Sequence, residues 1–135
     1  MTRLQAVPSV QITEHEFIRR AIPKLASKGS GHLGTNLSDL TEIFELQFDK
    51  SPTETLNKMI RVGAITVALI EWESYYDGFR SQSKPKSTEI LKAMPVEIPE
   101  GKSLRIYLSD NVPRHIRARQ KRRDRLHGML EEIKK

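Results

Sequence analysis

The apolar positions between Ser51 and Phe79 recur at roughly helical spacing and predict one long helix. These positions are Leu56, Met59, Ile60, Gly63, Val67, Ile70, Tyr75 and Phe79. Ser51 is placed to cap this helix, and Pro52 fits its first turn. No residue from 62 to 70 is charged. Because a helix that is apolar on every side is typical of a bundle core or a dimer seam, we expect this helix at the centre of the molecule.

Similar apolar stripes predict four further helices, and one alternating segment predicts a strand. The expected helices cover residues 13–29, 36–49, 87–94 and 113–135. Residues 81–86 are polar and predict a break between helices. Residues 104–108 alternate with a period of two and predict the strand. The sequence shows no partner strand, so we expect it to pair with a second copy or with the sheet edge of another protein.

These elements predict a mainly α fold, a helical bundle of four or five helices around a long central helix with one short β-strand near 104–108. The expected organisation is a helical core domain with a short N-terminal arm at 1–111, followed by a basic C-terminal helix or tail at 112–135. The sequence contains neither a signal-type apolar run nor a membrane-spanning segment, which predicts a cytoplasmic protein without a membrane partner. The absence of cysteine excludes disulfides and thiolate metal sites.

The net charge of +6 is confined to one end of the chain. Residues 1–111 hold 14 Lys and Arg against 14 Asp and Glu, whereas residues 112–135 hold 9 against 3. Within residues 114–125 there are seven cations beside a single acid, Asp124. The cations are Arg114, Arg117, Arg119, Lys121, Arg122, Arg123 and Arg125. A balanced body with a one-signed end is the pattern expected when that end contacts a polyanion.

This arginine-rich segment predicts contact with the phosphate backbone of DNA or RNA, because arginine makes bidentate hydrogen bonds to phosphate and stacks on bases. On a helix, positions 114, 117, 121 and 125 share one face. Cations of the first predicted helix are expected to assist, namely Arg19, Arg20, Lys24 and Lys28. Two other interpretations stay open: a solvated tail that only raises solubility, and a surface for an acidic protein partner.

The sequence offers no arrangement of residues that is typical of catalysis, so we expect a protein that is not an enzyme and uses no cofactor and no metal. The four histidines, His15, His32, His115 and His127, lack any metal-binding spacing. Residues 29–34 match G-x-G-x-x-G, but they follow a predicted helix rather than a strand. A helix C-cap with a connector is therefore the main interpretation, and a loop whose backbone contacts a phosphate is the alternative.

Residues 37–71 resemble the two helices of ribbon-helix-helix DNA-binding proteins. The matching features are Leu37, Leu40 and Phe44 on a first helix, a turn at 49–51, and Ser51, Glu54, Leu56 and Ile60 on a second. The resemblance implies an intertwined dimer whose paired strands enter the major groove of DNA. That strand would lie just before Leu37, where this chain has residues 29–34, so no base-reading residues are carried over.

Three functional hypotheses follow. The leading one is a non-catalytic nucleic-acid-binding protein, acting as an oligomer or inside a larger nucleoprotein complex, which contacts phosphates through its C-terminal helix. The second is a small structural subunit of an RNA-guided effector complex of the CRISPR kind, to which this chain is similar in size, expected helix content and charge. The third is a protein-binding adaptor or inhibitor that docks on an acidic partner.

Overall fold

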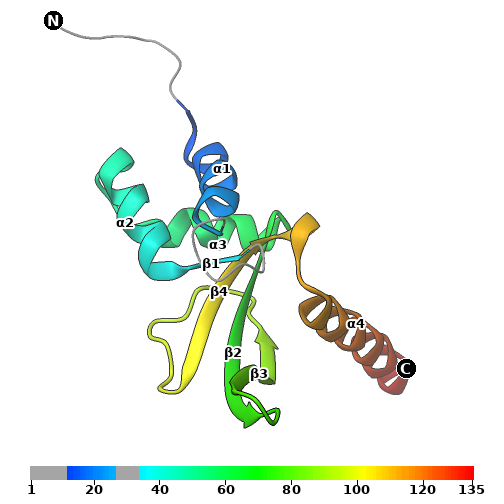
Figure 1. Cartoon of the computed structure of the whole chain (residues 1–135). Coiled ribbons are helices and arrows are strands. Elements are labelled where there is room, and N and C mark those ends of the chain that lie inside the picture. The colour runs from blue at the N-terminus through cyan, green and yellow to red at the C-terminus, as the bar shows by residue number, and fades with distance from the viewer. Residues whose placement is uncertain (1–11, 27–33) are drawn as a thin grey trace, which may run out of the picture.

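The computed structural model describes residues 12–26 and 34–135, which form helices on both faces of an antiparallel sheet (Figure 1). The described helices are α1 (Glu14–Ala26), α2 (Leu37–Phe48), α3 (Thr53–Arg61) and α4 (Arg114–Lys134), with a short 3-10 turn at Ser109–Asn111. The described strands are β1 (Gly34–Asn36), β2 (Ile65–Tyr76), β3 (Ser81–Ile90) and β4 (Lys102–Leu108), arranged across the sheet as β1-β4-β2-β3. The fold is therefore α/β, and the prediction of a mainly α helical bundle is wrong.

The central helix predicted from Ser51 to Phe79 is the largest correction. Only its first part is helical, because α3 ends at Arg61 and the chain turns at Gly63, whose φ of +78° favours glycine. The apolar run that follows is strand β2, and its residues from 65 to 70 are all buried. A strand buried on both faces shows no polar alternation, so its sequence resembles that of a buried helix.

The predicted break at 81–86 and the predicted helix at 87–94 are also wrong, because residues 81–90 form β3. β3 lies at the edge of the sheet, where Pro85 is tolerated because one side of the strand has no hydrogen-bonded neighbour. The pairing of β2 with β3 shifts register between Glu71 and Trp72, which marks a β-bulge. A polar edge strand with a proline and a bulge carries little of the signal by which strands are recognised in a sequence.

The strand predicted at 104–108 is confirmed as part of β4. Its partners are β1 and β2 of the same chain, not a second copy or another protein, so β4 lies inside the sheet. Three predicted helices are confirmed within the described part of the chain, as α1, α2 and α4. The capping side chains Thr13 of α1 and Asn36 of α2, and the apolar stripes of these helices, are local features that packing does not overrule.

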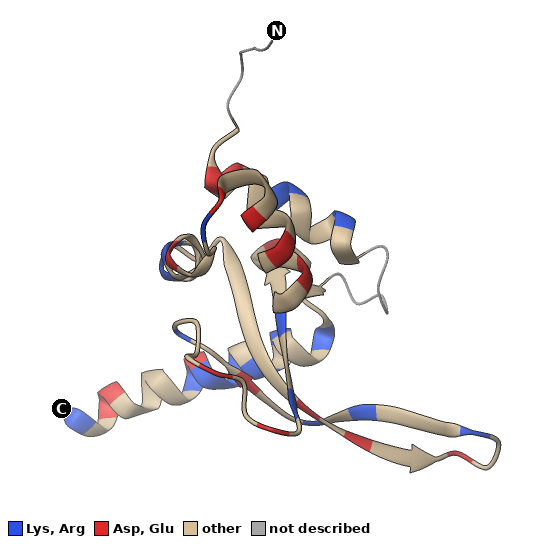
Figure 2. Ribbon diagram, turned by 90° about the vertical axis from the view of Figure 1, so that its left-hand side faces the viewer, with Lys and Arg blue, Asp and Glu red and all other residues tan. Residues whose placement is uncertain are grey.

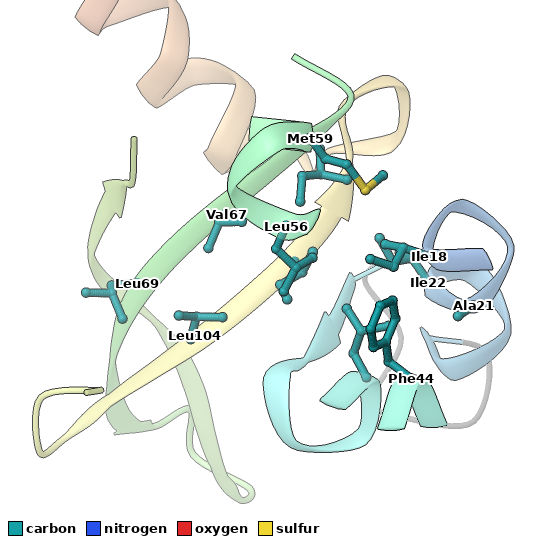
Figure 3. Close-up of a cluster of buried hydrophobic side chains, with 12 residues drawn as sticks. Ile18, Ala21, Ile22, Phe44, Leu56, Met59, Val67, Leu69 and Leu104 are labelled. Carbon is teal, nitrogen blue, oxygen red and sulfur yellow. The ribbon is translucent and has the colours of Figure 1, made fainter. Parts of the chain in front are cut away.

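Each face of the sheet carries its own hydrophobic core. Side chains alternate across a strand, so Val67 and Leu69 of β2 point to one face while Ala68 and Ile70 point to the other. The first face packs against α1, α2 and α3, as Figure 3 shows. Its largest helical contributors are Ile18, Ile22, Leu40, Phe44, Leu56 and Met59. The second face is covered by the start of α4, which places the basic helix directly on the sheet.

Candidate nucleic-acid interface

Helix α4 is anchored to the sheet by its first turns. Ile116 is fully buried and lies in one cluster with Ile70 of β2 and Tyr107 of β4. One turn further on, the side-chain amide of Gln120 donates a hydrogen bond to Oγ1 of Thr66, at 3.2 Å. These contacts hold the first turns of α4 against the sheet, so the backbone that carries the cations has a fixed position.

Two of the cations that are predicted to contact phosphate also donate hydrogen bonds to backbone carbonyl groups, which helps to hold α4 in place. Arg117 donates from Nη2 to the carbonyl oxygen of Val112 at 3.2 Å. Arg123 donates from Nη1 to the carbonyl oxygen of Ile90, at the end of β3, at 3.1 Å. A carbonyl is neutral, so these hydrogen bonds orient both guanidinium groups while leaving their positive charges without a counter-charge.

The other five predicted cations of α4 are exposed to solvent: Arg114, Arg119, Lys121, Arg122 and Arg125. Ion pairs among the described residues number six, and none of them includes a side chain from 114–125. Figure 2 shows these charges as blue bands along the first part of α4. The arginine-rich segment is therefore not neutralised by carboxylates within the described part of the protein.

The cations divide into two sets around the helix. Because successive residues are about 100° apart, Arg114, Arg117, Lys121 and Arg125 form one stripe along the exposed side. Eleven residues separate the ends of this stripe, a length of about 16 Å at about 1.5 Å per residue. The sequence-based prediction that these four positions share a face is confirmed, because the segment is helical.

Arg119 and Arg122 lie on another side of α4 and line a groove between this helix and β3. The remaining lining residues are Pro85, Lys86, Ser87, Thr88, His115 and Ala118. Lys86 is partly neutralised, because its Nζ lies 3.7 Å from a carboxylate oxygen of Glu71. The groove thus has a cationic wall on the α4 side and a hydroxyl-rich wall on the β3 side.

The predicted cations of α1 do not join this surface. Helix α1 packs against the opposite face of the sheet from α4, with Arg19 and Arg20 exposed (Figure 2). Arg20 lies 3.8 Å from the carboxylate of Glu16, and Arg19 lines a separate hollow with Asp110. Lys24 lies on the exposed side of α1, and Lys28 falls outside the described residues.

Helices α2 and α3 are joined by a tight turn, in the order of a helix-turn-helix. Asp49 closes α2 in the left-handed conformation, with φ of +57°, and α3 begins at Thr53. Residues 39–61 hold five acids and three bases, a net charge of −2. On α3, Asn57 accepts a hydrogen bond from the backbone N–H of Met94 at 2.7 Å, so its side chain is already engaged.

An aromatic group at the tip of the β2–β3 hairpin was not anticipated. Tyr75, Tyr76 and Phe79 are exposed there, although the spacing of Tyr75 and Phe79 predicted that these two belong to the buried stripe of a helix. The usable signal was the pair Asp77-Gly78 between two segments, since Asp-Gly is a strong hairpin turn sequence.

Metal chemistry finds no support in the described residues, which contain no group of three or more His, Asp or Glu side chains that could hold an ion. His15 and His127 lie on exposed parts of helices, His115 is half-buried, and His32 falls outside the described ranges.

Of the G-x-G-x-x-G match, only Gly34 is described, at the start of β1. No helix in ranges 12–26 and 34–135 is long and apolar enough to cross a membrane.

Comparison with models of protein families, with curated proteins and with solved structures found no match to this chain. The ribbon-helix-helix resemblance therefore stays a prediction. In the structure, β1 takes the place just before Leu37 where that family has its strand, and it pairs with β4 of the same chain.

Proposed function

We propose that this protein is a non-catalytic nucleic-acid-binding protein whose helix α4 contacts the phosphate backbone. The observation that supports this proposal is that five cations of α4 are exposed and unpaired with any described carboxylate. Such a dense charge repels itself, and phosphates relieve that repulsion while releasing condensed counterions. The solubility-tail hypothesis is less favoured because Ile116 and Gln120 fix the basic segment on the sheet.

The direction of α4 also favours an anion beside its first turns. The positive end of a helix dipole lies at the N-terminus, and the first turn of α4 contains no acid but does contain Arg114. Arg114 and the dipole repel one another, and a phosphate placed there would interact favourably with both. A ligand with phosphates along about 16 Å would contact the whole stripe from Arg114 to Arg125.

The helix-turn-helix is a second feature that is consistent with DNA. A helix, a short strand, two helices joined by a tight turn and an antiparallel hairpin follow one another, which is a winged helix-turn-helix order of elements. Fold alone does not establish function. Because residues 39–61 have a net charge of −2, we assign the phosphate contacts to α4 and give α3 a smaller part.

The last turns of α4 support the oligomer part of the proposal. Leu126, Met129, Leu130 and Ile133 form an exposed stripe at helical spacing, with exposed fractions of 43%, 54%, 44% and 77%. Two or three helical turns without packing are only marginally stable in water, so this stripe favours a partner. We propose that the partner is the same stripe of a second copy.

An antiparallel pair of tails superposes the stripe on itself, with Leu126 opposite Ile133 and Met129 opposite Leu130 of the second copy. The two phosphate-binding stripes would then be carried by one two-fold dimer.

The test measures how the affinity for a labelled duplex, and for its separated strands, depends on salt. Four neutralised phosphates give a slope of log K against log salt of roughly −3.6 for duplex DNA, and six give about −5. A variant with Arg114, Arg119, Arg122 and Arg125 changed to Gln should have a much flatter slope. These side chains are exposed and make no ion pair with a described carboxylate, so the fold should be preserved.

The matched control removes four exposed cations elsewhere, by changing Lys58, Arg61, Lys92 and Lys135 to Gln. It alters the net charge by the same amount, and it should retain most of the slope. A flat slope in the control but not in the α4 variant would move the contact surface to the cations that the control removes. Absence of any nucleic-acid affinity at low salt, with capture of an acidic protein instead, would overturn the proposal in favour of an adaptor.

A further inference from the structure

The β2–β3 hairpin extends beyond the rest of the sheet. β4 pairs with β2 only as far as Glu71, whereas β3 continues to pair with β2 as far as Tyr76 and Ser81. The last five residues of β2 therefore have only one neighbouring strand, and Figure 2 shows the hairpin projecting away from the helices. A two-stranded hairpin of this kind adds little to the hydrophobic core, so stabilising the core does not explain why it is present.

The tip of this hairpin is held in one conformation by Asp77. One carboxylate oxygen accepts hydrogen bonds from the backbone N–H groups of Phe79 at 2.9 Å and Arg80 at 3.1 Å. The other oxygen accepts from the side-chain amide of Gln82. Gly78, at φ of +99°, provides the left-handed residue that the turn requires. The position of the residue-79 backbone is thus fixed before any ligand arrives.

Phe79 is the apolar residue that this turn presents, and its side chain is 91% exposed. Its neighbour Tyr75 has a structural role, because its hydroxyl donates to Gln82 at 3.3 Å and Lys84 lies 5.3 Å from the centre of its ring. Phe79 has no comparable ring contact among the described residues. A large apolar ring exposed to water gains free energy when a flat partner covers it.

The hairpin is not cationic as a whole, since residues 65–90 hold four acids and three bases, and a phosphate contact there would depend on Arg80. Glu73 lies 3.6 Å from Lys84, and Glu71 lies 3.7 Å from Lys86, so both acids are paired with cations of β3. Arg80, next to Phe79, is exposed and has no ion pair with a described carboxylate. An aromatic ring beside an unpaired guanidinium suits a base with its adjoining phosphate.

The hairpin also connects directly to the α4 surface. Residues 85–88 of β3 form one wall of the groove whose other wall carries Arg119 and Arg122. Phe79 lies six residues from Pro85 along the chain, a span of up to about 20 Å at about 3.3 Å per residue. One nucleic-acid ligand bound along α4 could therefore also reach the tip.

We propose that the Phe79 ring is a base-stacking group, with Arg80 on the neighbouring phosphate, and this inference rests on the proposed nucleic-acid-binding function. The ligand chemistry is the flat face of a nucleobase. It has two possible sources: an unpaired base of a single strand, or a base step of a duplex that the ring opens as a wedge from the minor groove.

The experiment compares full-length Phe79→Ala and Phe79→Trp with the wild type on a single strand and on a duplex, each containing 2-aminopurine. Stacking is worth about 1–3 kcal/mol per base, so Phe79→Ala should weaken binding roughly 5- to 150-fold at fixed salt. The salt slope should not change, since no charge is removed. Phe79→Trp should restore affinity, and quenching of 2-aminopurine fluorescence should be lost only in Phe79→Ala.

Leu46→Ala is the matched control, because Leu46 is an exposed apolar residue on α2, at 83%. Quenching on the single strand alone assigns the unpaired base as ligand, whereas end-to-end fluorescence transfer that shows Phe79-dependent bending of the duplex assigns the wedge. Equal affinity of Phe79→Ala and wild type overturns the base-stacking role, and the α4 variant then tests the proposed function separately. Phe79-dependent binding to neutral phosphatidylcholine vesicles, without an effect on nucleic acid, also overturns it.

Discussion

The ring of Tyr107 occupies the space that any side chain at position 34 would need. A Cβ atom on Gly34 would lie 2.4 Å from Cε1 of Tyr107, and these two residues are direct partners in the pairing of β1 with β4. Tyr107 is buried, with only 2% of its surface exposed, so its ring has little room to move. The last glycine of the G-x-G-x-x-G match therefore has a packing role in the sheet, independent of any phosphate.

Changing Gly34 to Ala should destabilise the protein by about 1–3 kcal/mol, because the added methyl group overpacks a buried site. Thermal or denaturant unfolding would measure this change. Gly128→Ala is the control: a Cβ there meets nothing within 4 Å, and replacing a mid-helix glycine should stabilise by about 0.5–1 kcal/mol. Equal stability of the Gly34 variant and the wild type would contradict the packing role.

Ile116→Ala should loosen α4 from the sheet. The side chain is fully buried between Ile70 and Tyr107, and truncation of such a residue costs about 2–5 kcal/mol. Unfolding experiments would show the loss of stability, and nucleic-acid affinity should fall because the helix that carries the cations loses its fixed position. Val96→Ala should leave both unchanged, since Val96 is fully exposed. A stable variant with unaltered affinity would show that anchoring of the helix is irrelevant to binding.

The proposed tail pairing predicts a dimer by sedimentation or light scattering, in the absence of nucleic acid. Leu126→Ser with Leu130→Ser should convert it to a monomer by removing the apolar stripe. A monomeric wild type, or a dimer that survives both Ser substitutions, would contradict the tail pairing.

The hairpin tip should depend on pH in acid. Hydrogen bonds from the backbone N–H groups of Phe79 and Arg80 hold the pKa of the Asp77 carboxyl below its usual range. A lowered pKa in the folded state means that this contribution is fully present above the ordinary aspartate pKa and is lost as pH falls through the lowered value. Exchange of the Phe79 and Arg80 amide protons reports the effect by nuclear magnetic resonance.

At neutral pH, Asp77→Ala should speed that amide exchange and weaken base stacking, whereas Asp77→Asn keeps one acceptor oxygen and should behave more like the wild type. A titration of Asp77 at or above the ordinary aspartate pKa would contradict the structure of the turn.

The parts of the fold that follow from local chemistry were accessible from the residues. Capping side chains and an apolar stripe defined α1 and α2, and alternation at 104–108 defined part of β4. The basic character of α4 follows from composition alone. The shared face of Arg114 and Arg125 follows from their spacing once a helix is assumed. These features require no knowledge of what packs against them.

The amino-acid sequence by itself determined the helices with polar exteriors and the charge of α4. Only tertiary structure decided that residues 65–70 form a strand, because burial on both faces by two separate cores removes the alternation that identifies strands. It also decided that β3, a polar edge strand, pairs at all, and that the aromatic residues near Asp77 reach solvent instead of a helix core. In each case the outcome depends on a neighbour far along the chain, which local periodicity does not contain.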